Sequence, residues 1–267
     1  MSIKRAKQLA KYCLKAKTPF LFVGHSGIGK TGVMRQLAKE VCPDHEFITI
    51  MASQQEVGDF IGLPNFKQVE INGKSTEVTS WARPEWMPTK PAVIFLDELN
   101  NARQDVESAM LQLVYENRIH THELPEGSIV VAAINPATEE YTTANTMSAA
   151  LVKRFVVIPF EPHPEEVIKW GEDTGKYDNE FIKFMGHDLN VTGVNKELDT
   201  AIRLEPCPRM WEKISLTKKI IEDEKPANED EIIRDLITHS MGSEIAAKFF
   251  GWKESKEKPV TFADIIK

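Results

Sequence analysis

Apolar and polar positions along the first 160 residues predict strands that alternate with helices. Five short apolar runs are typical of buried strands, at residues 20–23, 47–50, 92–96, 129–134 and 155–160. Apolar residues also recur at helical spacing, as in residues 101–118, where Val106, Met110, Leu113 and Val114 share one face. Strands separated by helices indicate a mostly parallel sheet that helices cover on both faces.

The segment between Met51 and Pro91 is too long for a simple connection between a strand and a helix. Within it, Asn72 and Gly73 lie between runs of alternating residues, which predicts a β-hairpin. Trp81, Trp86 and Met87 follow among prolines. They either pack this loop against the core or form a contact patch, and the sequence leaves both interpretations open.

Beyond Phe160 the pattern changes to prolines, charges and helical periodicity, with no further strand-like run. Residues 208–223 and 229–241 are expected to be helices. We therefore predict two domains, an α/β domain over residues 1–160 and an all-α domain over residues 161–267.

Composition narrows the classes of partner. The chain has 33 basic and 40 acidic residues, a formal charge of −7, so no positive field attracts nucleic acid, which is an unlikely partner. No apolar run approaches the roughly 20 residues of a membrane span, and no membrane association is expected. The scattered Cys13, Cys42 and Cys207 fit reduced thiols. These features together predict a soluble, cytoplasmic protein.

The stretch GHSGIGKT at residues 24–31 has the spacing G-x-x-x-x-G-K-[ST]. It follows a predicted strand and opens a predicted helix, so its glycines and backbone N–H groups can wrap around phosphates. Lys30 would reach the terminal phosphates and Thr31 would ligate Mg²⁺. A mere tight turn is the alternative. The residues expected to hold nucleotide in this loop are Gly24, His25, Ser26, Gly27, Ile28, Gly29, Lys30, Thr31 and Gly32.

Asp97 and Glu98 end the apolar strand at residues 92–96. In open α/β sheets, ligands collect at the carboxyl ends of the strands. We expect Asp97 to hold Mg²⁺ and Glu98 to activate the attacking water. The alternative is that the two acids only cap the following helix.

Four motifs in order, GHSGIGKT, VIFLDELN, VVAAINP and ALVKRF, resemble the ATPase core of the AAA+ superfamily and, within it, the MoxR-like branch. The resemblance covers roughly residues 1–160 well. It implies a P-loop NTPase fold with a five-stranded parallel sheet of order 5-1-4-3-2 and a small helical lid. It also implies a homo-oligomeric, usually hexameric ring with ATP and Mg²⁺ at each subunit interface.

The same resemblance assigns three further residues. Asn135 matches the strand-end amide called sensor 1, which orients the water or senses the terminal phosphate; the alternative is a turn residue before Pro136. Arg154 matches the arginine finger that reaches the neighbouring subunit's nucleotide, although Lys153 is a competing cation. Arg209 resembles the lid arginine called sensor 2, with Cys207 at a position that is often a small residue.

Residues 52–91 resemble the helix-2 insertion of the MoxR-like branch, and residues 123–136 the hairpin that precedes sensor 1. The resemblance implies an ATP hydrolase that remodels a protein partner, in this branch one with a von Willebrand factor A domain. The choice of ATP over GTP comes from the resemblance alone. A nucleotide-dependent scaffold or switch and an NTPase motor acting on nucleic acid are the alternatives.

Overall fold

The computed structural model describes residues 1–135, 147–194 and 204–257. It divides into two compact units, Met1–Glu161 and Pro162–Lys267. Pro136, which ends one of the sequence motifs, lies outside the described residues. No helix in these described ranges combines the length and the apolarity that crossing a membrane requires.

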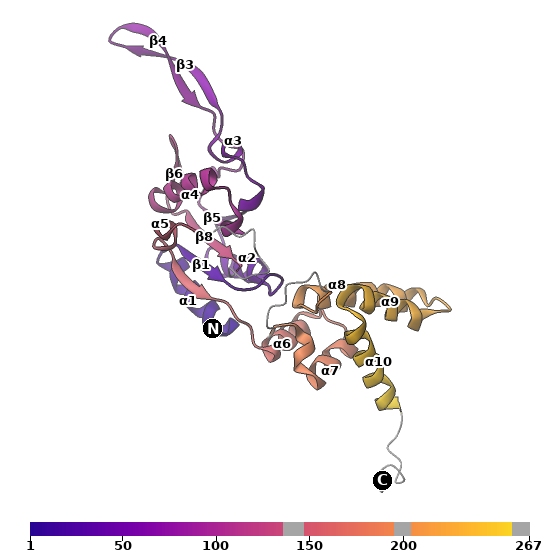
Figure 1. Ribbon diagram of the computed structural model, residues 1–267. Coiled ribbons are helices and arrows are strands. Elements are labelled where there is room, and N and C mark those ends of the chain that lie inside the picture. The colour runs from indigo at the N-terminus through magenta and orange to yellow at the C-terminus, as the bar shows by residue number, and fades with distance from the viewer. Residues whose placement is uncertain (136–146, 195–203, 258–267) are drawn as a thin grey trace, which may run out of the picture. The chain divides into compact units, whose positions relative to one another are not determined.

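The first unit is built on one parallel sheet of five strands (Figure 1). The strands are β1 Phe20–Val23, β2 Glu46–Met51, β5 Ala92–Asp97, β8 Ile129–Ile134 and β9 Val156–Pro159. They lie in the order β2-β5-β8-β1-β9, and every neighbouring pair is parallel. Numbered one to five along the chain and read from β9 to β2, this is the order 5-1-4-3-2, so the predicted topology is confirmed.

The central strands are buried on both faces because helices pack against the sheet. The long helices of this unit are α1 Ile3–Lys15, α2 Lys30–Val41 and α4 Gln104–Glu116. The predicted apolar face of α4 is confirmed, since Val106, Met110, Leu113 and Val114 are all buried in a cluster with β5 and β8. The short elements are η1 Ala52–Gln54, α3 Val57–Ile61, η2 Leu99–Asn101 and α5 Ala149–Val152.

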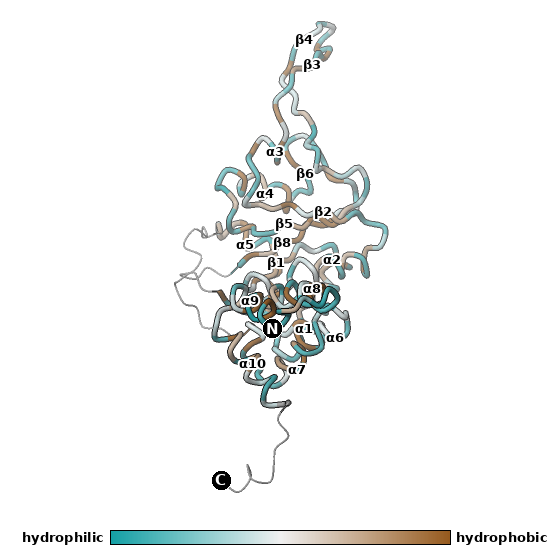
Figure 2. Tube along the Cα trace, turned by 90° about the vertical axis from the view of Figure 1, so that its right-hand side faces the viewer, coloured by the Kyte–Doolittle hydropathy of each residue, from teal (hydrophilic) through white to brown (hydrophobic). Residues whose placement is uncertain are grey.

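A long hairpin extends from this unit, formed by β3 Pro64–Ile71 and β4 Lys74–Trp81 (Figure 1). Its turn is the predicted Asn72-Gly73 pair, whose φ angles of 53° and 74° suit a two-residue hairpin turn. The predicted hairpin is therefore confirmed. Most of its residues are exposed, and short teal and brown stretches alternate along it (Figure 2).

The residues after this hairpin pack the loop down. Trp86 stacks on Phe60 with ring centroids 5.2 Å apart and donates a hydrogen bond to the Phe60 carbonyl at 2.9 Å. Met87 is 4% exposed. Of the two interpretations left open by the sequence, packing holds for these two residues.

A second, short hairpin joins β6 Arg118–Ile119 to β7 His122–Glu123. The expectation of a hairpin over residues 123–136 was wrong in position, because residues 129–134 form the central strand β8 instead. The short hairpin packs on the base of the long one: the Trp81 ring lies 4.3 Å from that of His120, and His122 Nε2 lies 3.0 Å from the Trp81 carbonyl oxygen.

The second unit is helical in its described residues, as expected. Its elements are α6 Pro164–Thr174, α7 Asn179–His187, η4 Leu189–Thr192, α8 Pro208–Glu224, α9 Glu229–Met241 and α10 Ser243–Glu257. The predicted helices at 208–223 and 229–241 are confirmed. Aromatic rings fill the core, among them Phe181, Phe184, Trp211 and Phe249.

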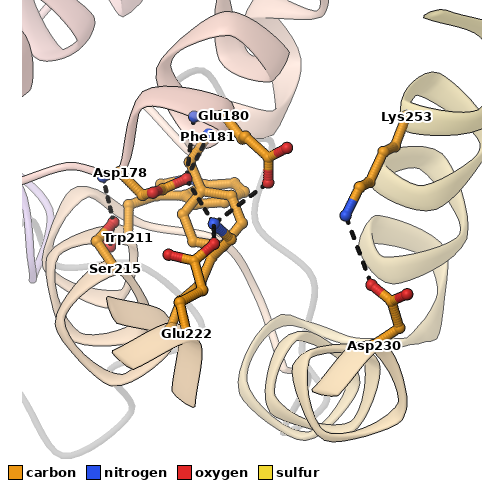
Figure 3. A network of polar contacts seen from close by, with 9 residues as sticks. Asp178, Glu180, Phe181, Trp211, Ser215, Glu222, Asp230 and Lys253 are labelled. Carbon is orange, nitrogen blue, oxygen red and sulfur yellow. Dashed lines mark hydrogen bonds and ion pairs between the residues drawn. The ribbon is translucent and has the colours of Figure 1, made fainter. Parts of the chain in front are cut away.

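One buried amine ties α7 to α8. The Lys218 side chain is 2% exposed, and its Nζ lies 3.2 Å from carboxylate oxygens of both Asp178 and Glu180 and also contacts Glu222. Figure 3 shows the three carboxylates turned toward this one nitrogen. Burial alone would lower the pKa of Lys218, but the hydrogen bond to Glu222 and the charges of Asp178 and Glu180 raise it above its ordinary value.

Candidate nucleotide site

The glycine loop joins the carboxyl end of β1 to the first turn of α2. Gly27 and Gly29 have φ angles of 78° and 94°, in the left-handed region that favours glycine. A Cβ on Gly24 would lie 2.3 Å from the Phe160 carbonyl oxygen, so no larger residue fits there without a shift. The loop's conformation therefore requires the glycines that the motif supplies.

Lys30 begins α2 and turns back into the loop. Its side chain is almost fully buried, and its Nζ donates to the carbonyls of Gly24 at 2.5 Å and His25 at 2.8 Å. It also donates to Asn135 Oδ1 at 2.8 Å, so two predicted site residues 105 positions apart are in contact. A buried ammonium needs polar partners, and these three oxygens supply them. An anion bound beside Lys30 would offer oxygens of the same kind.

Thr31 and Asp97 also come together, as a metal-holding pair would require. Thr31 Oγ1 donates to Asp97 Oδ2 at 2.7 Å. Asp97 is the last residue of β5, and its other oxygen accepts a hydrogen bond from the Glu98 N–H at 3.0 Å. A hydroxyl and a carboxylate are oxygen ligands of the kind that Mg²⁺ prefers.

Glu98 follows directly in a left-handed conformation, with φ 54° and ψ 40°. It stands at the start of η2 but makes no side-chain capping hydrogen bond there, so the capping alternative does not describe it. Instead its Oε2 accepts a hydrogen bond from Ser53 Oγ at 2.9 Å. Ser53 comes just after β2, the sheet neighbour of β5, and was not among the residues singled out from the sequence.

Asn135 directly follows the last residue of β8 and is 7% exposed. Besides holding Lys30, it accepts a hydrogen bond at its backbone carbonyl from Asn100 Nδ2 at 3.0 Å. Asn100, in η2, is 4% exposed, and its Oδ1 is buried with no hydrogen-bond partner in the described part of the chain. This second asparagine links the acidic strand to Asn135 and was also missed from the sequence.

Not all predicted residues join this cluster. Ile28 is buried, whereas Ser26 and Gly32 are exposed. Arg154 contacts Ala150 and Tyr115, and none of its described contacts reaches the glycine loop. Arg209 lies in the second unit, exposed near the start of α8 in a groove that Lys213 and Lys219 also line.

Curated relatives match part of this chain. The human protein "Mitochondrial disaggregase" is 35% identical over 122 residues, which are 43% of this chain and 16% of that protein. "Chaperone protein ClpB" of Rhodopirellula baltica is 36% identical over 107 residues, 38% of this chain and 11% of that protein. The chain therefore matches less than a fifth of the length of each of these relatives.

Solved structures agree on the fold. One mutant of RuvB from Thermotoga maritima superposes with a TM-score of 0.53 at 12% identity, covering 94% of this chain and 69% of that chain. A second RuvB mutant from the same organism gives a TM-score of 0.51 at 13% identity, covering 93% and 68%. Identities this low support the shared fold only.

A sequence profile of known proteins decides the family. The profile described as "AAA domain (dynein-related subfamily)" matches residues 19–155, just over half of the 267 residues. This range holds the glycine loop, the acidic strand end, Asn135 and Arg154. The chain belongs to the dynein-related subfamily of AAA domains.

Proposed function

We propose that this chain is an Mg²⁺-dependent ATP hydrolase whose active site is shared between neighbouring subunits of a homo-oligomeric ring. The observation that carries the proposal is the convergence of Lys30 on the glycine loop and Asn135, beside the pair formed by Thr31 and Asp97. Phosphate-binding, metal-holding and water-orienting groups thus meet at one edge of the sheet.

The residues present suit the triphosphate and its metal ion. The N–H groups of the glycine loop and the start of α2 offer partial positive charge to phosphate oxygens, and Lys30 adds a full one. Thr31 and Asp97 would hold Mg²⁺, which supplies charge neutralisation of the phosphates when bound. In binding ATP, Lys30 exchanges its carbonyl partners for phosphate oxygens.

Glu98 is the proposed base that takes a proton from the attacking water. Its hydrogen bond with Ser53 holds the carboxylate at the carboxyl edge of the sheet. Asn135, whose backbone carbonyl accepts a hydrogen bond from Asn100 and whose side chain contacts Lys30, is the proposed residue that orients the water. These assignments follow the residue types that phosphoryl transfer to water requires.

Arg154 is the proposed arginine finger, acting on the nucleotide of the next subunit. Its guanidinium makes no contact with its own glycine loop in the described chain, as a residue acting in trans should behave. We further propose a ring of six subunits and a cytoplasmic location. Residues 1–160 would form the nucleotide-binding domain, and residues 161–267 a lid in which Arg209 is sensor 2.

The partner we propose is a protein with a von Willebrand factor A domain, as in the MoxR-like branch. The exposed hairpin β3–β4, with Phe66 73% exposed, is the surface that supports an external protein contact. Replacing residues 65–80 by a short Gly-Ser linker should abolish binding of an isolated domain of that kind while ATP turnover remains. Equal binding by both forms would contradict the hairpin as the contact.

The direct test is ATP turnover by the purified protein and by Glu98→Gln. The variant should bind ATP with Mg²⁺ as tightly as the wild type, because the amide keeps the shape of the carboxylate. It should hydrolyse ATP at least a hundredfold more slowly, because the amide is not a base. A wild type without turnover would contradict the proposal and favour a nucleotide-dependent scaffold, and a variant as fast as an active wild type would contradict the role of Glu98.

A further inference from the structure

Arg154 is a cation without a carboxylate partner in the described ranges of the chain. Its Nη1 donates to the Ala150 carbonyl, one helical turn earlier, and its buried Nε has no hydrogen-bond partner there. The guanidinium carbon lies 5.1 Å from the centre of the Tyr115 ring. The contact that holds this side chain from another element is therefore aromatic and not ionic.

Tyr115 is a largely exposed aromatic residue. It lies in the last turn of α4 and is 71% exposed, so burial of its ring does not account for it. The face of this ring carries the Arg154 guanidinium, and a cation over a tyrosine face is attracted by the ring's quadrupole. Tyr115 is largely exposed and Arg154 is partly buried, and Tyr115 is not part of the buried apolar cluster of the sheet.

A second contact joins α4 to the segment that carries Arg154. Glu107 Oε1, two turns earlier on α4, accepts a hydrogen bond from the Ser148 N–H at 2.8 Å. Ser148 caps α5 by accepting from the Leu151 N–H at 3.3 Å. Through Glu107, α4 contacts Ser148 at the start of α5, and through Tyr115 it contacts Arg154, two residues beyond the end of α5. Both views draw the two helices side by side (Figures 1 and 2).

We propose that Tyr115 is a positioning residue that presents Arg154 to the nucleotide of the neighbouring subunit. This rests on the proposed function, in which Arg154 is the finger. A free arginine samples many rotamers, and ordering it costs free energy in the transition state. The ring of Tyr115 and the Ala150 carbonyl order it beforehand. Because no carboxylate pairs with Arg154 in the described residues, its charge is left for phosphate.

A subunit-mixing experiment separates the proposed role of Tyr115 from the proposed active site shared between subunits. Glu98→Gln has a dead active site and an intact finger, whereas Arg154→Ala has an intact site and no finger. Mixed together, the two inactive proteins should recover ATP turnover at the interfaces where an Arg154→Ala site meets a Glu98→Gln finger. No recovery would contradict the shared active site itself.

The inference is then tested by adding Tyr115→Leu to the Glu98→Gln subunit, which supplies only the finger. Recovered turnover should fall about three- to tenfold, as loss of one partly exposed cation–π contact allows. The kcat should carry this loss with little change in KM for ATP, because the finger acts on transition-state charge. Unchanged recovery, or recovery above that of the parent mixture, would overturn the inference.

Two further subunits make the result specific. Tyr115→Phe keeps the aromatic face and should restore full recovery, which a role for the hydroxyl would not allow. Tyr12→Leu replaces another exposed tyrosine, 60% exposed on α1, and should have no effect. If Tyr115→Phe fails as badly as Tyr115→Leu, or if Tyr12→Leu lowers recovery equally, the aromatic contact is not what positions Arg154.

Discussion

At the scale of single residues, the amide of Asn100 donates to the Asn135 carbonyl at 3.0 Å and so holds the backbone of the residue that we propose orients the water. Asn100→Asp keeps the shape but places an acceptor against an acceptor. Turnover should fall about tenfold while ATP still binds, since one lost hydrogen bond of about 1.4 kcal/mol corresponds to that factor.

Asn101→Asp is the matched control, because it puts the same charge on the adjacent and less buried position. Steady-state kcat and KM are measured for both variants, and thermal unfolding shows whether either variant is less stable. Equal kcat values for the two variants would show that the contact with Asn135 does not matter for hydrolysis.

The residues that sequence reasoning missed share one property. Lys30, Thr31 and Asp97 stand in contiguous motifs, so their chemistry can be read locally. Ser53 and Asn100 act through partners 45 and 35 positions away, and a serine or asparagine alone carries no chemical signature. Only the sheet order, which sets β2 beside β5 and β5 beside β8, brings these pairs together.

At the scale of elements, Lys218 joins α7 to α8, and its contacts lead to a prediction about stability. Lys218→Met leaves three carboxylates without their shared cation, and should lower the free energy of unfolding by about 2 kcal/mol. This expected loss is smaller than for a fully buried ion pair, because the carboxylate side chains are 18–40% exposed. Lys219→Met, at an exposed neighbouring position, should change it little. Urea unfolding of each variant, followed by tryptophan fluorescence, measures the difference.

The same lysine fixes the sign of the pH dependence. Its folded-state pKa is raised, so its contribution is fully present below the ordinary lysine pKa of about 10.4 and is lost as pH rises through the folded value. The unfolding free energies of wild type and Lys218→Met should therefore converge once the pH exceeds the folded-state pKa of Lys218. A gap that stayed constant into strongly alkaline solution would contradict the charged cluster.

Elements were predictable where a periodic pattern was long or apolar. The run of residues 129–134 is the strand β8 without adjustment, and the helix over residues 229–241 is α9. The second hairpin was misplaced because β6 and β7 have only two residues each, too few for a pattern to show. Tertiary contact with the base of the long hairpin holds them in place.

At the scale of the whole molecule, sheet order and family agree. The order β2-β5-β8-β1-β9 places the ends of β1, β5 and β8 side by side, which is where the glycine loop, the acidic pair and Asn135 meet. The resemblance that the four ordered motifs carry implied this strand order, and three of the motifs lie at the ends of β1, β5 and β8. The assembly in which Arg154 would act involves a second chain, and a single sequence describes only one.

The measurement that tests the shared active site most directly is ATP turnover per subunit as protein concentration rises, for wild type and Arg154→Ala. Specific activity of the wild type should climb with concentration and then level off, as subunits assemble. Arg154→Ala should bind ATP yet stay at least a thousandfold slower at every concentration, the scale of a lost arginine finger. A flat wild-type rate together with an unaffected Arg154→Ala would show instead that each chain hydrolyses ATP alone.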